Sequence, residues 1–206
     1  ACAIGELKFG LGKKYSDFVW MTVSTGVGGA SVSDGTLIRG ADGFAGELGH
    51  TIIRHDGRLH KNTGIKGTLE SYASATGVRE TALELLRQYP DIPSLIRQYE
   101  NEEQITSKTV YDCAVKGDQI ANEVFRFTGQ ILGEALANFV MFSSPEAIIL
   151  FGGLTKAGDL ILNPTKQAME ASLIQVFKNK VKLLFSQLPE ADSAILGASA
   201  LVMEAE

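Results

Sequence analysis

The apolar positions follow two different periods along the chain, and these separate the predicted helices from the predicted strands. Over residues 118–142 they recur every three or four positions, which predicts a long amphipathic helix that Pro145 ends. Residues 147–151 form a short, continuous apolar run instead, which predicts a strand buried on both faces. Weaker patterns predict further helices over residues 1–11, from 69 to a break at Gly77, and over 78–88, 107–115, 165–177 and 191–204, and further strands over 51–53 and 181–188.

A glycine-rich corner interrupts two β-prone runs near the N-terminus. The run that begins at Phe18 meets the corner at residues 25–29, and a second run at 30–32 leads to Asp34-Gly35, a pair typical of hairpin turns. Glycines let backbone N–H groups come close to an anion, because no Cβ stands in the way. The corner therefore predicts a phosphate site formed by Thr25, Gly26, Gly28 and Gly29.

The corner matches neither of the two common phosphate motifs. Ala30-Ser31 follows the last glycine, so the Lys-Ser/Thr pair of a P-loop is missing, and Ser31 stands where the dinucleotide fingerprint needs glycine. A strand, a glycine corner and a second strand are instead typical of actin-like and hexokinase-like ATPases.

Strands that alternate with helices predict an α/β fold with a central mixed sheet flanked by helices. Gly152-Gly153 follows the buried strand 147–151 directly and precedes helical sequence. Open α/β sheets bind nucleotides at such carboxyl ends of strands, although Gly-Gly at this place is also a common strand–helix turn. Gly152 and Gly153 are therefore candidates for nucleotide binding. For Gly197, near the start of the last predicted helix, close packing is the favoured role.

Composition excludes several functional classes. The chain has 206 residues, of which 45% are hydrophobic and 21% charged, and its net charge is −5. We expect no membrane span and no nucleic-acid binding by this chain, because neither a long apolar run nor a basic stripe is present. Cys2 and Cys113 are the only cysteines and lie far apart in sequence, which is typical of a reduced, cytoplasmic protein.

The sequence also contains Glu-x-Gly-His at residues 47–50 and Leu-Glu-x-Tyr-Ala-Ser at 69–74. Together with residues 25–29, 152–153 and 196–198, these segments resemble the ROK family, which comprises bacterial sugar kinases such as glucokinases and sugar-responsive repressors. The resemblance extends over nearly the whole chain, and the motifs at 47–50 and 69–74 are its most specific elements. It implies a ribonuclease-H-like or actin-like ATPase lobe and an ATP-dependent hexose kinase.

The resemblance also assigns roles to individual residues. It implies that Glu47, His50 and Glu70 bind a glucose-like sugar, and carboxylates suit that task because they accept strong hydrogen bonds from hydroxyls. Alone, Glu70 would more often be a first-turn helix acid and His50 a packed or surface histidine. It further implies ATP and Mg²⁺ as cofactors and a homodimer. The family's catalytic Asp would precede Ala1, so we expect residues 1–206 to be the C-terminal lobe, inactive alone.

The chain departs from the family pattern in residues 55–67, which we expect to be a surface loop. In most family members the counterpart of His50 and three cysteines hold a structural zinc, but the matching positions here are Lys61, Thr63 and Thr68. We expect no zinc, and a loop held by hydrogen bonds from Asn62, Thr63 and Thr68 instead.

Two other functions remain open at this point. The first is a sugar-sensing transcriptional regulator of the same family, which would need a DNA-binding module elsewhere. The second is a pseudo-kinase lobe that serves only for dimerisation. Binding of a sugar or ATP would argue against the second.

Overall fold

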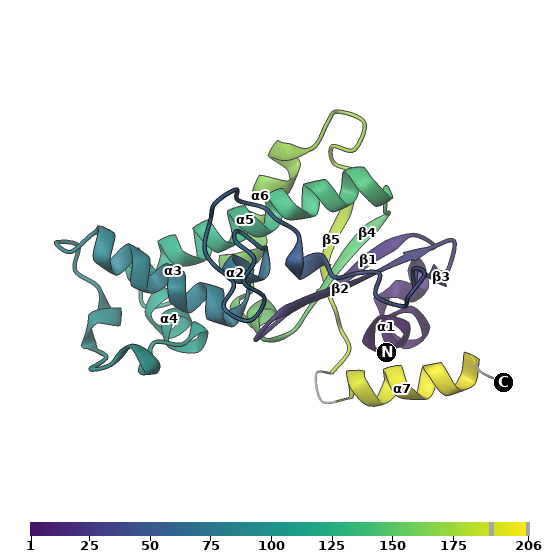
Figure 1. Cartoon of the computed structure of the whole chain (residues 1–206), viewed down its shortest axis with the longest axis horizontal. Coiled ribbons are helices and arrows are strands. Elements are labelled where there is room, and N and C mark those ends of the chain that lie inside the picture. The colour runs from purple at the N-terminus through teal and green to yellow at the C-terminus, as the bar shows by residue number, and fades with distance from the viewer. Residues whose placement is uncertain (190–191, 205–206) are drawn as a thin grey trace.

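A five-stranded mixed sheet forms the centre of the molecule (Figure 1). The computed structural model describes residues 1–189 and 192–204. The strand order is β3-β2-β1-β4-β5, in which β1 pairs antiparallel with β2 and parallel with β4. The strands are β1 (Phe18–Val23), β2 (Val27–Ser33), β3 (Thr36–Leu37), β4 (Ala147–Phe151) and β5 (Lys182–Phe185).

Helices cover both faces of this sheet. The helices are α1 (Cys2–Phe9), α2 (Glu70–Ala73), α3 (Ala75–Gln88), α4 (Ser107–Ala114), α5 (Gln119–Ser143), α6 (Asp159–Ser172) and α7 (Ser193–Glu204). Short 3-10 helices are η1 (Leu11–Lys14), η2 (Leu48–His50), η3 (Leu95–Gln98), η4 (Glu102–Gln104) and η5 (Gly153–Ala157). In Figure 1, α5 and α6 lie on one side of the sheet, and α1 and α7 lie on the other.

The side chains of the central strands alternate between two hydrophobic cores, one on each face of the sheet. In β1, Val19 and Met21 point into the core beneath α5, whereas Phe18 and Trp20 point into the smaller core beneath α1. In β4, the residues alternate in the same way. Successive side chains of a strand point to opposite faces, so a strand that is apolar at every position must be covered twice. The prediction of a doubly buried strand at residues 147–151 is confirmed.

Three predicted elements differ from the structure. The helix break predicted at Gly77 lies at Ser74, whose hydroxyl caps α3 by accepting from the Gly77 N–H at 3.0 Å. Gly77 lies inside α3, where any side chain would overlap the carbonyl oxygen of Tyr72. Residues 51–53 form no strand, because Ile52 pairs with Thr68 only as an isolated bridge.

The third difference is α6, which begins at Asp159 and contains Pro164, although the sequence predicted a start after that proline. Pro164 packs closely against Gly129 of α5. Helix α7 begins at Ser193, and the predicted start at residue 191 lies outside the described residues. Gly197 packs against the first residues of α1, so close packing is confirmed as its role.

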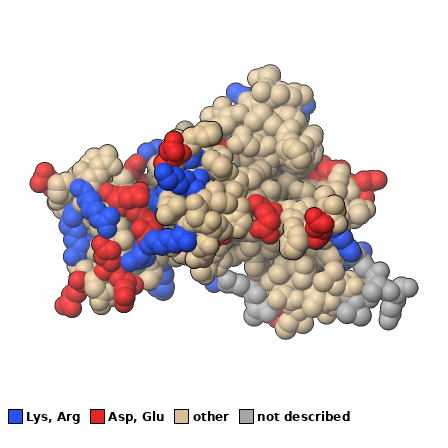
Figure 2. Space-filling view, viewed as in Figure 1, with Lys and Arg blue, Asp and Glu red and all other residues tan. Residues whose placement is uncertain are grey.

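Surface charge is mixed on the face shown in Figure 2. Basic and acidic side chains alternate over the end that carries α3 and α4, and the part that covers the sheet is mostly uncharged. Within the part of the chain that the structure describes, no helix has both the length and the apolar character needed to cross a lipid bilayer.

Candidate functional site

The turn between β1 and β2 anchors the candidate site. The turn is closed by a hydrogen bond from the Ser24 N–H to the Gly26 carbonyl at 2.9 Å. The Ser24 carbonyl accepts from the Ala75 N–H at 2.7 Å, which brings the N-terminus of α3 to the turn. The Val27 N–H donates to Oε2 of Glu70 at 2.7 Å. The predicted phosphate corner and one predicted sugar ligand therefore meet directly.

Two glycines of the corner are needed for close approaches. A Cβ on Gly26 would lie 2.7 Å from Oε2 of Glu70, and a Cβ on Gly29 would lie 2.5 Å from the Leu48 side chain. Gly28 and Gly29 belong to β2 and not to the turn itself. Phosphate binding by Thr25, Gly26, Gly28 and Gly29 stays a prediction, and packing against Glu70 and η2 is a second reason for two of the glycines.

Glu70 begins α2, and its side chain is 19% exposed. Each carboxylate oxygen accepts one hydrogen bond from the protein: Oε2 from the Val27 N–H, and Oε1 from Nε2 of His60, also at 2.7 Å. An ionised carboxylate has about four acceptor positions. Glu70 thus retains acceptor capacity on both oxygens for hydroxyl groups of a ligand.

His50 and Glu47 lie beside this pair, in and just before η2. His50 Nε2 lies 3.7 Å from Oε2 of Glu47, whose side chain is 66% exposed. The His50 ring also packs edge-on against His60, with 5.4 Å between the ring centroids. Among the described residues, His50 Nδ1 is a buried atom without a hydrogen-bond partner. His60 thus contacts Glu70 and His50, and His50 in turn lies beside Glu47. The sequence did not single out His60.

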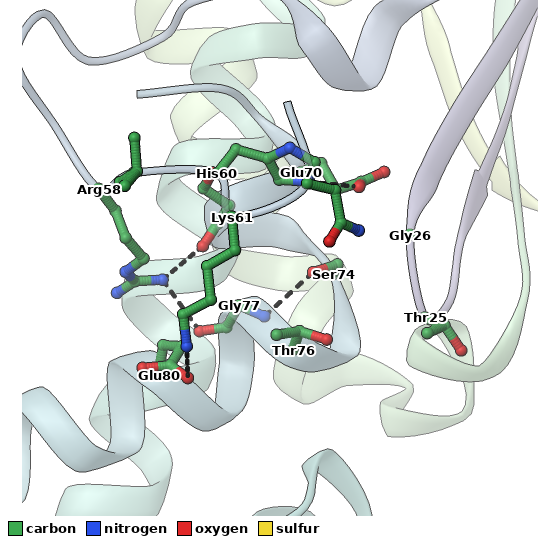
Figure 3. A pocket seen from close by; sticks show the side chains of 13 residues that line it. Thr25, Gly26, Arg58, His60, Lys61, Glu70, Ser74, Thr76, Gly77 and Glu80 are labelled. Carbon is green, nitrogen blue, oxygen red and sulfur yellow. Dashed lines mark hydrogen bonds and ion pairs between the residues drawn. The ribbon is translucent and has the colours of Figure 1, made fainter. Parts of the chain in front are cut away.

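A cavity of about 460 Å³ opens between the turn and the 55–67 loop (Figure 3). Thr25, Gly26 and Glu70 are among the lining residues, and Figure 3 shows the Glu70 side chain close to Gly26. His60 and Asn62 line the loop side, whereas Glu47 and His50 are not among the lining residues. The wall is rich in hydroxyls, carboxylates and backbone polar groups, which suits a polar ligand.

A second cavity of about 460 Å³ lies on the other side of Thr25. It is lined by the turn residues Ser24 and Thr25, by Tyr111 of α4, and by Gly153, with other residues of α4, α5 and η5. Gly152 has a φ of +106°, which glycine adopts without strain, and it turns the chain from β4 into η5. The cavity lies at the carboxyl end of β4, where open α/β sheets bind nucleotides.

At the rim of this second cavity, Lys108 donates a hydrogen bond to Asp112 at 2.7 Å. This bond, together with the Asp112 charge, raises the pKa of Lys108 above its usual value. Lys108 thus adds a positive charge to the lining of the cavity.

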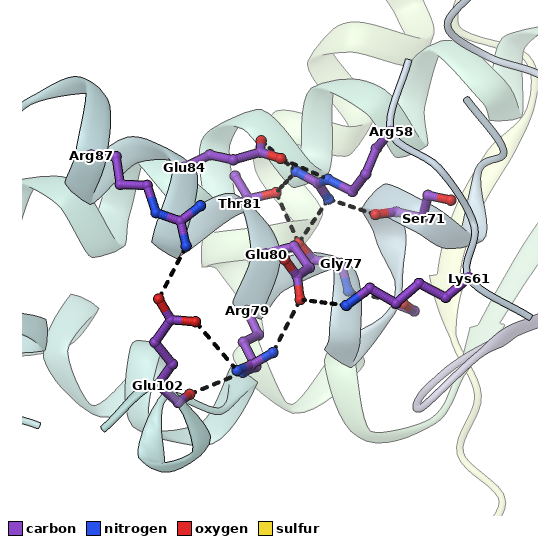
Figure 4. A network of polar contacts seen from close by, with 11 residues as sticks. Arg58, Lys61, Ser71, Gly77, Arg79, Glu80, Thr81, Glu84, Arg87 and Glu102 are labelled. Atoms are coloured by element: carbon purple, nitrogen blue, oxygen red, sulfur yellow. Dashed lines mark hydrogen bonds and ion pairs between the residues drawn. The ribbon is translucent and has the colours of Figure 1, made fainter. Parts of the chain in front are cut away.

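The 55–67 loop is a small hairpin, with an isolated bridge between Leu59 and Lys66. Of the residues predicted to hold it, Thr63 bonds to His60 and Thr68 bonds to Ser71, whereas Asn62 lines the cavity. Arg58, which the sequence did not single out, fixes the loop onto α2 and α3 by donating to the carbonyls of Ser71 and Gly77 (Figure 4).

The loop does not fit a structural zinc. Lys61, Thr63 and Thr68 supply neither thiolate nor imidazole, and these are the groups that structural zinc requires. Across residues 1–189 and 192–204, no group of three or more His, Cys, Asp or Glu is arranged to hold a metal ion.

The five-stranded mixed sheet with helices on both faces has the fold of an actin-like ATPase lobe, as predicted, and it is shared by a ROK family glucokinase structure. The match to a family model covers residues 1–205, and the chain belongs to the ROK family.

Individual relatives agree with this assignment. A glucokinase of Halalkalibacterium halodurans is 33% identical over 204 residues, which make up 99% of this chain and 61% of that protein. The structure is similar to that of a ROK family glucokinase from Streptomyces griseus in complex with glucose and AMPPNP, with a TM-score of 0.86 and 29% identity over 97% of this chain and 64% of the other. NagC, a DNA-binding transcriptional dual regulator of Escherichia coli, is 29% identical over 98% of this chain and 48% of its own length. The chain thus spans less than two thirds of these relatives.

Proposed function

We propose that this chain is the sugar- and nucleotide-contacting part of an ATP-dependent hexose kinase that phosphorylates the 6-hydroxyl of a glucose-like sugar. The observation that carries the proposal is the position of Thr25. It lines both the cavity that contains Glu70 and the cavity that contains Gly153. A phosphoryl group that passes from a nucleotide in one cavity to a sugar in the other would cross the turn at Thr25.

The sugar would be oriented by Glu70, His50 and Glu47. Glu70 keeps free acceptor capacity on both oxygens, and the Glu47 carboxylate is accessible to a ligand. Carboxylates bind hydroxyls through charge-assisted hydrogen bonds. Carboxylates held in a fixed orientation would therefore hold the sugar so that its 6-hydroxyl, the nucleophile, faces the phosphoryl group. Phosphoryl transfer depends mainly on positioning and charge neutralisation, so such orientation is the larger part of the catalysis.

The residues around the second cavity fit a nucleotide. Tyr111 and Phe125 offer aromatic surface for a base, and Thr25 offers a hydroxyl for a phosphate. Mg²⁺ usually binds through phosphates and one or two carboxylates, so it would arrive as the magnesium complex of ATP and needs no protein cage. It would neutralise charge on the transferred group.

The test is turnover by the complete protein that contains this chain. ADP release should depend on both ATP and a hexose, with glucose or a close relative as the best substrate. Absence of turnover and of binding with every hexose and N-acetylhexosamine would contradict the proposal. We assign no catalytic base in residues 1–206, so the isolated chain should release no ADP above the rate without sugar.

The second candidate is a sugar-sensing regulator, which the similarity to NagC favours. Measuring sugar binding, ATP turnover and DNA binding by the complete protein distinguishes the regulator from the kinase. A regulator would bind a sugar without ATP turnover, and its complete form would bind DNA with an affinity that the sugar changes. We also propose a homodimer, which sedimentation of the complete protein would test.

A further inference from the structure

His60 lies between the 55–67 loop and α2, with a side chain only 11% exposed. Both of its ring nitrogens are engaged. Nε2 lies 2.7 Å from Oε1 of Glu70, and Nδ1 lies 2.8 Å from the Thr63 hydroxyl. These contacts account for both polar atoms of the imidazole, so the ring has a single favoured orientation.

The partners determine where the ring protons lie. An ionised carboxylate only accepts hydrogen bonds, so Nε2 carries a hydrogen and donates it to Glu70. In the neutral ring, Nδ1 then accepts from the Thr63 hydroxyl, whose oxygen also accepts from the Ile65 N–H at 3.3 Å. The loop thus fixes Thr63, Thr63 fixes the ring, and the ring fixes one oxygen of Glu70.

Glu70 is held from two directions by two separate parts of the chain. The Val27 N–H from β2 binds Oε2, and His60 from the loop binds Oε1. One such bond would leave the carboxylate free to rotate about its terminal torsion, which is a broad and weakly restricted one. Two bonds on different oxygens set the plane of the group. The side chain of Glu70 is also largely shielded from water, so the bond is weakened little by solvent.

His60 also contacts the second predicted sugar ligand. Its ring packs edge-on against that of His50, where the buried Nδ1 of His50 has no hydrogen-bond partner among the described residues. With no metal ligand set in the loop, this ring contact is a direct restraint on the His50 imidazole. A single side chain therefore touches two of the three candidate sugar ligands.

We propose that His60 is a positioning residue that orients Glu70, and through ring packing His50, toward the sugar. The inference rests on the proposed hexose-binding function. It gives the 55–67 loop a role beyond packing. The conformation of the loop sets the orientation of the proposed sugar-binding carboxylate of Glu70 through Thr63 and His60.

The test compares two substitutions of His60 in the complete protein, each of which keeps a polar group at the position of only one ring nitrogen. His60→Gln keeps a donor near the Nε2 position and can still reach Glu70. His60→Asn keeps a polar group near the Nδ1 position and loses the bond to Glu70. The control is His55→Asn, the same substitution at an exposed histidine of the same loop.

His60→Asn should raise the KM and the Kd for the hexose about 10-fold, because a misoriented Glu70 loses a hydrogen bond to a sugar hydroxyl. A hydrogen bond to a charged group contributes about 1.5–3 kcal/mol, and each 1.4 kcal/mol is tenfold. The KM for ATP should stay within about twofold, and His60→Gln should recover most of the hexose affinity. His55→Asn should match the wild type. Equal losses in the Gln and Asn variants, parallel losses for ATP, or unchanged hexose affinity in His60→Asn would overturn the proposal.

A readout that needs no activity keeps this result separate from the proposed function. The urea midpoint is measured for His60→Asn, Glu70→Gln and the double variant. Coupled side chains give shifts that do not add, whereas independent ones add. If the wild type neither binds nor phosphorylates any hexose, the proposed function fails. Additive midpoint shifts would overturn the contact between His60 and Glu70 whatever the function is.

Discussion

Glu6 is a fully buried carboxylate outside the candidate site, and the protein surrounds it with donors. Its Oε1 accepts from the Leu11 N–H at 2.7 Å, and its Oε2 accepts from the Ser186 hydroxyl at 2.5 Å. A side chain at Gly10 would overlap this carboxylate, so the glycine after α1 makes room for Glu6 in addition to ending the helix. Glu6 thereby ties α1 to the segment after β5.

Replacing this carboxylate should therefore cost stability. We expect Glu6→Ala to lower the free energy of unfolding by about 1–3 kcal/mol, because buried donors lose their acceptor. Glu6→Gln retains one acceptor oxygen and should lose less. Urea denaturation of the complete protein measures both, and an alanine variant as stable as the wild type would show that water replaces the lost bonds.

Cys113 differs from Cys2 in its exposure and therefore in its reactivity. Burial raises the pKa of the Cys113 thiol, and the nearby Asp118 charge raises it further. The thiolate is the reactive form, so a raised pKa moves alkylation to higher pH. In the native protein at pH 8, iodoacetamide should modify Cys2 and spare Cys113, and both should react after denaturation. Mass spectrometry of the labelled peptides checks this, and rapid native labelling of Cys113 would contradict it.

At the scale of elements, α5 and α6 pack through glycines one turn apart. A Cβ on Gly129 would lie 2.6 Å from the Pro164 ring, and a Cβ on Gly133 would overlap the carbonyl oxygen of Thr165. In an isolated helix, Gly→Ala stabilises by about 1 kcal/mol. Here the new methyl meets backbone that cannot move cheaply, and overpacking costs about 1–3 kcal/mol.

We therefore expect Gly133→Ala to destabilise the protein by up to about 2 kcal/mol, which is the overpacking cost less the gain in helix propensity. Thermal unfolding of the complete protein measures the change. A higher melting temperature for the variant would show that the two helices can move apart without cost.

Arg58 fixes the 55–67 loop to α2 and α3. Its guanidinium donates to the carbonyls of Ser71 and Gly77 and to the Thr81 hydroxyl, and it lies 4.6 Å from the centroid of the Tyr72 ring (Figure 4). It also pairs with Glu84, but that carboxylate is half exposed and contributes less. The arginine side chain itself is only 12% exposed.

Loss of this side chain should loosen the loop selectively. We expect Arg58→Ala to cost about 1–3 kcal/mol and to increase proteolysis within residues 55–67, because the loop loses its bonds to the Ser71 and Gly77 carbonyls. Arg58→Lys should recover only part of the loss, since an ammonium cannot reproduce the guanidinium fork. Limited proteolysis with Lys66→Ala as the exposed control checks this. Equal cleavage of all three variants would assign the loop's stability to its backbone bonds alone.

The sheet and the long helix could be predicted from sequence because their apolar periods are strong. Errors occurred where a tertiary contact overrides a local rule. Gly77 is a poor helix former but fills a site with no room for a side chain, and Pro164 lies inside α6, where its ring packs closely against Gly129. Ile52 is β-prone but finds only a bridge partner.

The family pattern named candidate site residues but not their geometry, and their roles stay predictions. It singled out Glu70, which the structure places against the predicted phosphate corner. His60 and Arg58 were missed, since neither belongs to a motif and their partners lie about 10 to 26 residues away in sequence. Only the hairpin of the 55–67 loop brings these side chains to α2 and α3, and no sequence period encodes such a contact.

At the scale of the whole molecule, the β1–β2 turn joins the two halves of the candidate site. One half depends on α2 and the 55–67 loop, and the other on α4 and η5. The turn is tied to the start of α3 by the Ala75–Ser24 backbone bond and to α2 by Glu70. The β1–β2 turn lines both cavities, so a ligand in either cavity would contact it. Among the described residues, Thr25 is the one residue that lines both.

Thr25 offers a direct test of this arrangement in the complete protein. Thr25→Val keeps the shape of the side chain and removes the hydroxyl, whereas Thr25→Ser keeps the hydroxyl. If the hydroxyl binds the phosphoryl group in transit, its contact is strongest in the transition state, so its loss lowers kcat and leaves both KM values little changed. We expect about a 10- to 100-fold lower kcat for the valine variant, as a hydrogen bond to a charged group is worth about 1.5–3 kcal/mol, and near wild-type kcat for serine. A valine variant that loses only hexose affinity would place the hydroxyl on the sugar instead, and unchanged kinetics would remove Thr25 from the path between the cavities.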